Sequence, residues 1–156
     1  MAERRYDVRA VKDRLKQYWE GEKDLIAQTE QLQRLELLMV GVGAQRLTDM
    51  PKSPSPPRDR LTDLLYRKQE MEEEIAEQIS HQREERKYIN DTLRKVRSAD
   101  EKNVIRCRYF SGMKWQEVAA AVFGNCEDYD DKAESYLKRV QVLHGRALYH
   151  MAISAE

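Results

Sequence analysis

Apolar residues recur at alternating steps of three and four along the first part of the chain. The stripe runs from Val8 to Met39 and is weakened by polar residues at Glu22 and Thr29. This spacing predicts a long amphipathic helix of the coiled-coil type. Gly21 lies inside the stripe, where a glycine costs a helix about 1 kcal/mol, so a local bend is expected there. We predict a helical region over residues 1–45.

All four prolines fall in "PKSPSPP", residues 51–57. Because proline lacks an amide donor and restricts the residue before it, we predict a Pro-rich connector at 46–58. Residues 61–97 contain no glycine or proline and repeat apolar residues at helical spacing, which predicts a second long helix over 59–97. One helix cannot bury so thin a stripe alone. Either the two helices form an antiparallel hairpin, or copies of the chain pair as a coiled coil.

The last third of the chain carries shorter apolar runs between glycines. "SADE", residues 98–101, has the spacing of a capping box that begins a helix, and Gly112 stands where that helix should end. "KWQEVAAAVF" predicts a second short helix, and a longer one is expected from about Lys132. This order is typical of a helix-turn-helix module, which we place at 98–156. A three-helix bundle without a role on DNA is the alternative.

The whole chain is therefore expected to be all-α: a long helical hairpin or coiled coil, followed by a three-helix module. The 28 basic and 28 acidic residues balance, so any binding to nucleic acid must depend on local charge. No apolar run approaches the roughly 20 residues of a membrane span. The first residues lack the apolar core of a secretion signal. We expect a soluble, cytoplasmic protein that does not contact a membrane.

The residues that usually carry chemistry do not form a recognisable site. Cys107 and Cys126 lie near apolar residues, and we expect both to be buried, reduced thiols. The three histidines do not complete a set of metal ligands with them. We find no phosphate-binding glycine loop and no catalytic grouping. We therefore expect neither an enzyme nor a bound metal or cofactor.

Charge is distributed unevenly within the predicted module. Residues 135–151 hold three cations and two histidines but no carboxylate, whereas 127–134 hold five carboxylates. A helix that enters a groove of DNA needs this clearance, because phosphates repel carboxylates. Lys138, Arg139 and Gln141 lie outside the apolar stripe and can reach outward. Lys114 and Trp115 begin the second helix, where the amides favour a phosphate oxygen.

The segments "VIRCRYFSGMKWQEVAAAVFG" and "ESYLKRVQVLHGRAL" resemble the helix-turn-helix of sigma-factor region four. They are more closely similar to transcriptional regulators of the RinA/ArpU type from phages and prophages. The matching residues are Arg108, Tyr109, Gly112, Trp115, Glu117, Val118, Ala119, His144, Ala147 and Leu148. The resemblance covers the last third of the chain by motif, and residues 1–97 by layout only.

The resemblance implies a sequence-specific, DNA-binding regulator of phage or prophage genes. It places Lys138, Arg139, Gln141 and Val142 over bases, with Ser135 and Arg146 toward phosphate. Double-stranded DNA is then the expected partner. RNA polymerase and a second copy of the chain, held through the N-terminal helices, are further candidates. One departure is that "GNCEDYDDKAE" is longer and more acidic than the usual turn, which leaves open whether it helps or hinders docking. Two other functions remain: a small terminase subunit for DNA packaging, and a coiled-coil adaptor that does not bind DNA.

Overall fold

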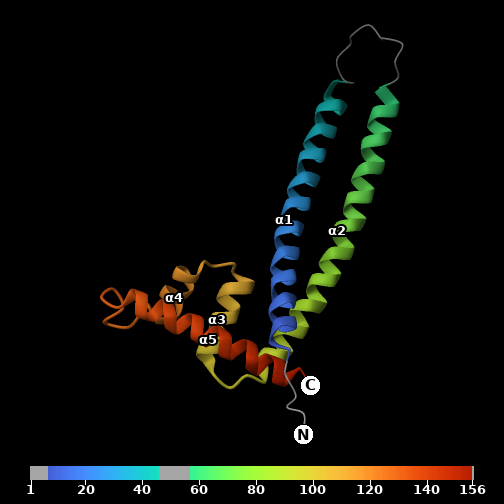
Figure 1. The fold of residues 1–156 in the computed structure, drawn as a ribbon. Helices are drawn as coiled ribbons and strands as arrows, with labels where there is room; N and C mark the ends of the chain where they lie inside the picture. Colours follow the sequence, from blue (N-terminus) through green and yellow to red (C-terminus); the bar gives the residue numbers. More distant parts are fainter. Residues whose placement is uncertain (1–6, 46–56, 156) are drawn as a thin grey trace. The chain divides into compact units, whose positions relative to one another are not determined.

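The computed structural model describes residues 7–45 and 57–155, and every regular element in this part of the chain is a helix. Two helices of 38 residues come first, α1 (Val8–Gln45) and α2 (Pro57–Arg94). They are followed by α3 (Ala99–Ile105), the π-helical segment η1 (Arg106–Phe110), α4 (Trp115–Phe123) and α5 (Ala133–Ser154) (Figure 1). The predicted all-α fold is confirmed. None of the helices in the described ranges combines the length and the apolar character needed to cross a membrane.

Helices α1 and α2 run antiparallel to each other. Gln78 Nε2 donates to the Gly21 carbonyl oxygen at 3.1 Å, and Lys68 Nζ lies 3.8 Å from Glu36 Oε1. As the residue numbers increase along α1, the residue numbers of their partners in α2 decrease. The two helices therefore form an antiparallel hairpin, which is one of the two predicted arrangements. Helix α2 begins at Pro57, a favoured first helical residue, so the end of the predicted 46–58 connector is helical. The rest of that connector, 46–56, lies outside the described residues.

The chain divides into two compact units. Unit 1 consists of residues 1–20 together with 84–156, and unit 2 consists of residues 21–83. Unit 2 has a small apolar core of Leu35, Val42 and Leu64. Unit 1 contains, besides residues 98–156, the first turns of α1 and the last turns of α2. The three-helix segment thus shares its core with parts of both long helices.

Unit 1 has two apolar clusters. The first joins the long helices to α3, η1 and α5 and consists of Leu15, Tyr18, Ile89, Leu93, Val96, Ile105, Tyr109, Ala147, Leu148 and Met151. The second joins α3, α4 and α5 and consists of Val104, Val118, Ala119, Phe123 and Val140. Burying one large aliphatic side chain contributes about 1.5–3 kcal/mol, so these clusters supply most of the force that holds α5 in place.

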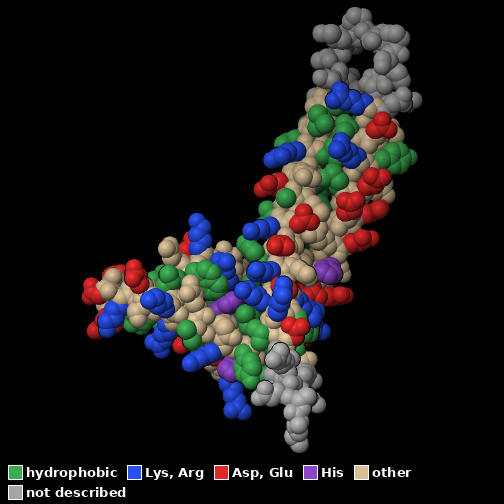
Figure 2. All heavy atoms as spheres, in the orientation of Figure 1, with side chains coloured by type: hydrophobic (Ala, Val, Ile, Leu, Met, Phe, Trp, Pro, Cys, Tyr) green, Lys and Arg blue, Asp and Glu red, His purple; other side chains and the backbone are tan. Residues whose placement is uncertain are grey.

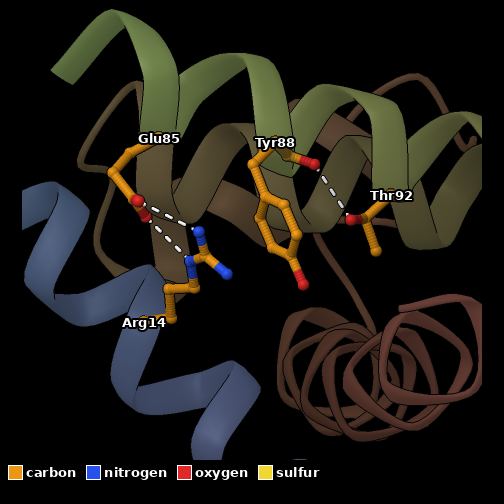
Figure 3. Close-up of polar contacts among 4 residues, drawn as sticks. All are labelled: Arg14, Glu85, Tyr88 and Thr92. Carbon is orange, nitrogen blue, oxygen red and sulfur yellow. Dashed lines mark hydrogen bonds and ion pairs between the residues drawn. The ribbon is translucent and has the colours of Figure 1, made fainter. Parts of the chain in front are cut away.

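A polar contact joins α1 to α2 inside unit 1. Arg14 donates from Nε to Glu85 Oε2 at 2.8 Å and from its terminal nitrogen to Oε1 at 3.0 Å (Figure 3). The guanidinium also lies 3.5 Å from the centre of the Tyr88 ring. This bidentate geometry constrains the relative orientation of the two helices as well as the distance between them.

The turn between η1 and α4 depends on Gly112. Its φ is +65°, a left-handed conformation that favours glycine. The sequence predicted that the preceding helix ends at this residue. The Trp19 indole of α1 lies against this turn, and a Cβ placed at residue 112 would clash with it. The absence of a side chain therefore serves both the backbone conformation and the packing of α1 on the turn.

The predicted helix over 98–111 is two kinds of helix joined end to end. Ser98 caps α3 by accepting a hydrogen bond from the Glu101 amide at 3.4 Å. From Arg106 onward the turns widen, and the Ser111 amide donates to the Arg106 carbonyl at 3.1 Å, five residues back. Nothing in the local pattern of residues indicated this π-helical turn, which is stabilised by the burial of Tyr109.

The two cysteines differ from the expectation in one case. Cys107 is half-buried, and burial raises the pKa of its thiol. Cys126 is exposed in the turn after α4, so the prediction that both are buried is wrong. Phe123, three residues earlier in the sequence, is buried, but Cys126 is not.

Candidate nucleic-acid interface

Helix α5 is anchored along one side. Its 22 residues carry Val140, His144, Ala147, Leu148 and Met151 at steps of three and four, and all five are buried. These side chains pack on α3, η1 and α4 and on the ends of the long helices that belong to unit 1. The opposite side of α5 is consequently held outward on a rigid support.

The outward side carries six of the eight residues predicted to contact DNA. These six residues, all of them exposed, are Ser135, Lys138, Arg139, Gln141, Val142 and Arg146. Val142 is 54% exposed, which is high for an apolar residue in the middle of a helix. No aspartate or glutamate occurs from 135 to 155. We call the exposed side of α5 the outer face.

The outer face continues further than the sequence prediction. Tyr149 is 46% exposed and Ile153 is 38% exposed, and both extend the row that contains Val142 at helical spacing. The spacing of 142, 149 and 153 was visible in the sequence. The sequence did not indicate that these residues are exposed, because aromatic and aliphatic residues are more often buried.

Arg139 is positioned by an aromatic side chain. Its guanidinium carbon lies 5.0 Å from the centre of the Phe123 ring, at the end of α4. Such a contact favours one orientation of a long side chain that is otherwise free to rotate. Figure 2 shows Lys and Arg side chains gathered along the segment of unit 1 that contains α5, with acidic side chains at the end where the turn after α4 lies.

The start of α4 holds the other two predicted residues, and there the structure differs from the prediction. Lys114 is exposed, but its amide donates to the Glu117 carboxylate at 2.7 Å. The expected free amide at Lys114 is therefore already occupied within the chain. Trp115 is half-buried, and its ring packs edge-on against His144 with the centroids 4.8 Å apart. Glu117 thus caps α4.

Both histidines of α5 have partners within the chain. His144 is buried, and its Nε2 lies 2.8 Å from the Tyr109 hydroxyl. Burial, followed by the nearby charges of Lys12 and Arg108, lowers the pKa of His144 to about 4. His150 Nδ1 lies 2.7 Å from a carboxylate oxygen of the buried Glu101.

The acidic segment before α5 is partly neutralised. The Tyr136 hydroxyl donates to Asp128 at 2.6 Å, and Lys132 Nζ lies 3.1 Å from the other Asp128 oxygen. These contacts, the Tyr136 hydrogen bond first, lower the pKa of Asp128. Four further carboxylates of the segment are on exposed residues, namely Glu127, Asp130, Asp131 and Glu134. Glu134 lies in the first turn of α5, where a negative charge suits the helix dipole.

Comparisons with known proteins leave the family open. No protein-family model, curated protein or solved structure matches this chain. The likeness to sigma-factor region four and to RinA/ArpU-type regulators consequently rests on the quoted motifs alone. The function has to be argued from the site.

Arg108 is the residue of this region whose role the sequence did not reveal. It is one of the motif residues of the resemblance, and its terminal nitrogen donates to the Met113 carbonyl at 2.8 Å. Its guanidinium carbon lies 4.5 Å from the centre of the Trp115 ring. Arg108 thereby ties η1 to the turn at Gly112 and to α4, so it supports the orientation of the helices.

Proposed function

We propose that this protein is a sequence-specific DNA-binding transcriptional regulator of phage or prophage genes, and that it contacts DNA through the outer face of α5. One observation carries the proposal. Lys138, Arg139 and Arg146 are exposed on a helix that has no carboxylate over 135–155 and whose other side is buried. A surface of this kind attracts phosphate without the repulsion that acidic neighbours would add.

The distribution of charge between the two units supports the same assignment. Residues 1–20 and 84–156 contain 19 basic and 16 acidic residues, whereas residues 21–83 contain 9 basic and 12 acidic residues. The neutral chain is thus positive in the unit that holds α5 and negative in the other. Local rather than total charge decides whether a surface attracts nucleic acid.

The chemistry of the outer face fits a groove of DNA. The major groove is about 12 Å wide and admits an α-helix. Lysine and arginine bind phosphates and guanine edges, an amide such as that of Gln141 pairs with adenine, and an exposed aliphatic group such as Val142 contacts the thymine methyl group. A face made of these types can both position the helix and distinguish sequences.

The regulatory role rests on the resemblance to the phage regulators. In this proposal unit 1 reads the DNA, and the long helices provide the surface for RNA polymerase or for a second copy of the chain. The acidic segment before α5 limits how deeply the first turn of that helix can enter the groove. Contacts are therefore expected from Lys138 onward rather than from the very start of α5.

Selection from a random-sequence duplex library tests the proposal. The full chain is incubated with the library at moderate salt, and the retained DNA is sequenced. We expect one enriched motif and an affinity for it that decreases linearly with salt on logarithmic axes. If the chain retains DNA without enriching any sequence, specific recognition is wrong. If it retains none even at low salt, the role on DNA is abandoned and the adaptor function is favoured.

A further inference from the structure

The outer face of α5 contains a glycine that packing within the chain does not explain. Gly145 lies in the interior of α5, one turn after Gln141 and Val142 and one turn before Tyr149. A Cβ built at residue 145 would meet no other atom within 4 Å. Glycine destabilises the interior of a helix relative to alanine, and no contact within the chain requires a glycine at this position.

Two other glycines of the chain have reasons that the structure shows. Gly112 has a positive φ, and a side chain there would strike Trp19. At Gly21 a Cβ would lie 2.6 Å from Gln82 Oε1, so the missing side chain leaves room for the end of the Gln82 side chain. Gly41 and Gly43 are as open as Gly145, but they lie within five residues of the end of α1, whereas Gly145 lies in the interior of α5. Gly145 therefore has the character of a position that another molecule approaches closely.

We propose that DNA comes closest to the backbone of α5 at Gly145. We call this open position, which lies between the exposed residues Val142 and Tyr149, the notch. The inference rests on the proposed function. The choice of DNA as the occupant follows from charge, since Lys138 and Arg146 lie on the same face and 135–155 contains no carboxylate. A side chain at residue 145 holds the helix away from the groove wall and lengthens every contact around it.

The inference predicts that stability and DNA binding respond in opposite directions to one substitution. Gly145→Ala fits the free protein without a clash and favours the helix, so the melting temperature rises by about 2–4 °C. DNA affinity decreases by about five- to tenfold, because the added methyl group keeps the groove wall away from the backbone of α5. Gly145→Leu also introduces a good helix former, and it decreases DNA affinity further than Gly145→Ala because the leucine side chain is larger.

The measurement pairs thermal unfolding with fluorescence anisotropy on a labelled mixed-sequence duplex of about 30 base pairs, roughly three helical turns. Gly41→Ala is the matched control, because a Cβ at residue 41 also meets nothing within 4 Å but lies in α1, within unit 2. We expect it to leave DNA affinity unchanged. Light scattering on the same variants measures the oligomeric mass.

The possible results separate this inference from the proposed function. If the wild-type chain binds DNA and Gly145→Ala binds equally well, the notch has no role on DNA and only the inference fails. If Gly145→Ala changes the oligomeric mass and leaves DNA affinity intact, the notch is a contact between copies, and the inference is overturned. If the wild-type chain does not bind DNA at low salt, the proposed function and the inference both fail.

Discussion

The Tyr109 hydroxyl lies 2.8 Å from Nε2 of His144, inside the interface between η1 and α5. The Trp115 ring packs edge-on with the same imidazole, and the Arg108 guanidinium lies over the Trp115 ring. Burial first, and then the nearby charges of Lys12 and Arg108, favours the neutral form of His144. At neutral pH His144 is therefore part of the core, where it is held by a hydrogen bond rather than by charge.

Stability should consequently decrease in mild acid. The pKa of His144 is about 4 in the folded chain and 6.5 is its ordinary value, so between these values the unfolded chain binds the additional proton. The free energy of unfolding then decreases as the pH falls from about 6.5 to about 4, by a total on the order of 2–3 kcal/mol. Urea unfolding at several pH values measures this slope.

His144→Gln provides the comparison, because glutamine keeps an acceptor for Tyr109 but does not titrate. We expect the decrease between pH 6.5 and 4 to be smaller in this variant, whatever its stability at pH 7. His81→Gln, at an exposed position of α2, should retain the wild-type slope. Equal slopes in wild type and His144→Gln would assign the acid sensitivity to another group.

Gly112→Ala should be strongly destabilising. Alanine at a φ of +65° is strained, and its Cβ also meets the Trp19 ring. The two effects together are expected to lower the free energy of unfolding by about 2–4 kcal/mol. Chemical denaturation followed by circular dichroism measures the decrease.

A double variant separates the two contributions. Trp19→Leu shortens the side chain that the new methyl group would strike, so Gly112→Ala should cost less stability in the Trp19→Leu background than in the wild type. The part that remains, about 1 kcal/mol, is the backbone strain. If Gly112→Ala has the same cost in both backgrounds, Trp19 does not constrain the turn.

Removing cations from the outer face should weaken DNA binding and lower its salt dependence. Lys138→Ala, Arg139→Ala and Arg146→Ala each remove a positive charge from α5. For each DNA phosphate that is no longer neutralised, the slope of log affinity against log salt decreases by about one. Anisotropy titrations at several salt concentrations give both quantities. Arg67→Ala, an exposed arginine of α2 in unit 2, is the matched control and should change neither.

Neutralising the acidic segment should strengthen binding at low salt. The change combines Glu127→Gln, Asp130→Asn and Asp131→Asn and keeps Asp128, whose carboxylate bonds to Tyr136 and Lys132. Less repulsion of phosphate is expected to raise affinity several-fold, with little effect on thermal unfolding because these residues are exposed. A decrease in affinity would instead give the segment a positive role in docking.

The parts of the fold that follow from local chemistry were predicted well. Ser98 caps α3, and Gly112 ends the helix in a left-handed conformation, because each effect needs only a few neighbouring residues. The inward residues of α4 and α5 follow from helical spacing. The outward position of Lys138, Arg139 and Gln141 follows from the same periodicity.

The parts that depend on distant residues were not predictable. The π-helical turn at Arg106–Phe110 and the neutral state of His144 both arise from packing against elements far away in the sequence. A single sequence also does not reveal that Trp19 of α1 packs on the turn at Gly112.

The cluster that joins Leu15 and Tyr18 to Leu148 and Met151 has a consequence for biosynthesis. A ribosome releases Leu15 long before it adds Met151, so the early helix must wait for its partners while most of the chain is still being made. Closing a contact between segments so far apart in the sequence is entropically costly, and it slows folding relative to local contacts. A nascent chain halted before α5 should expose this apolar surface to chaperones.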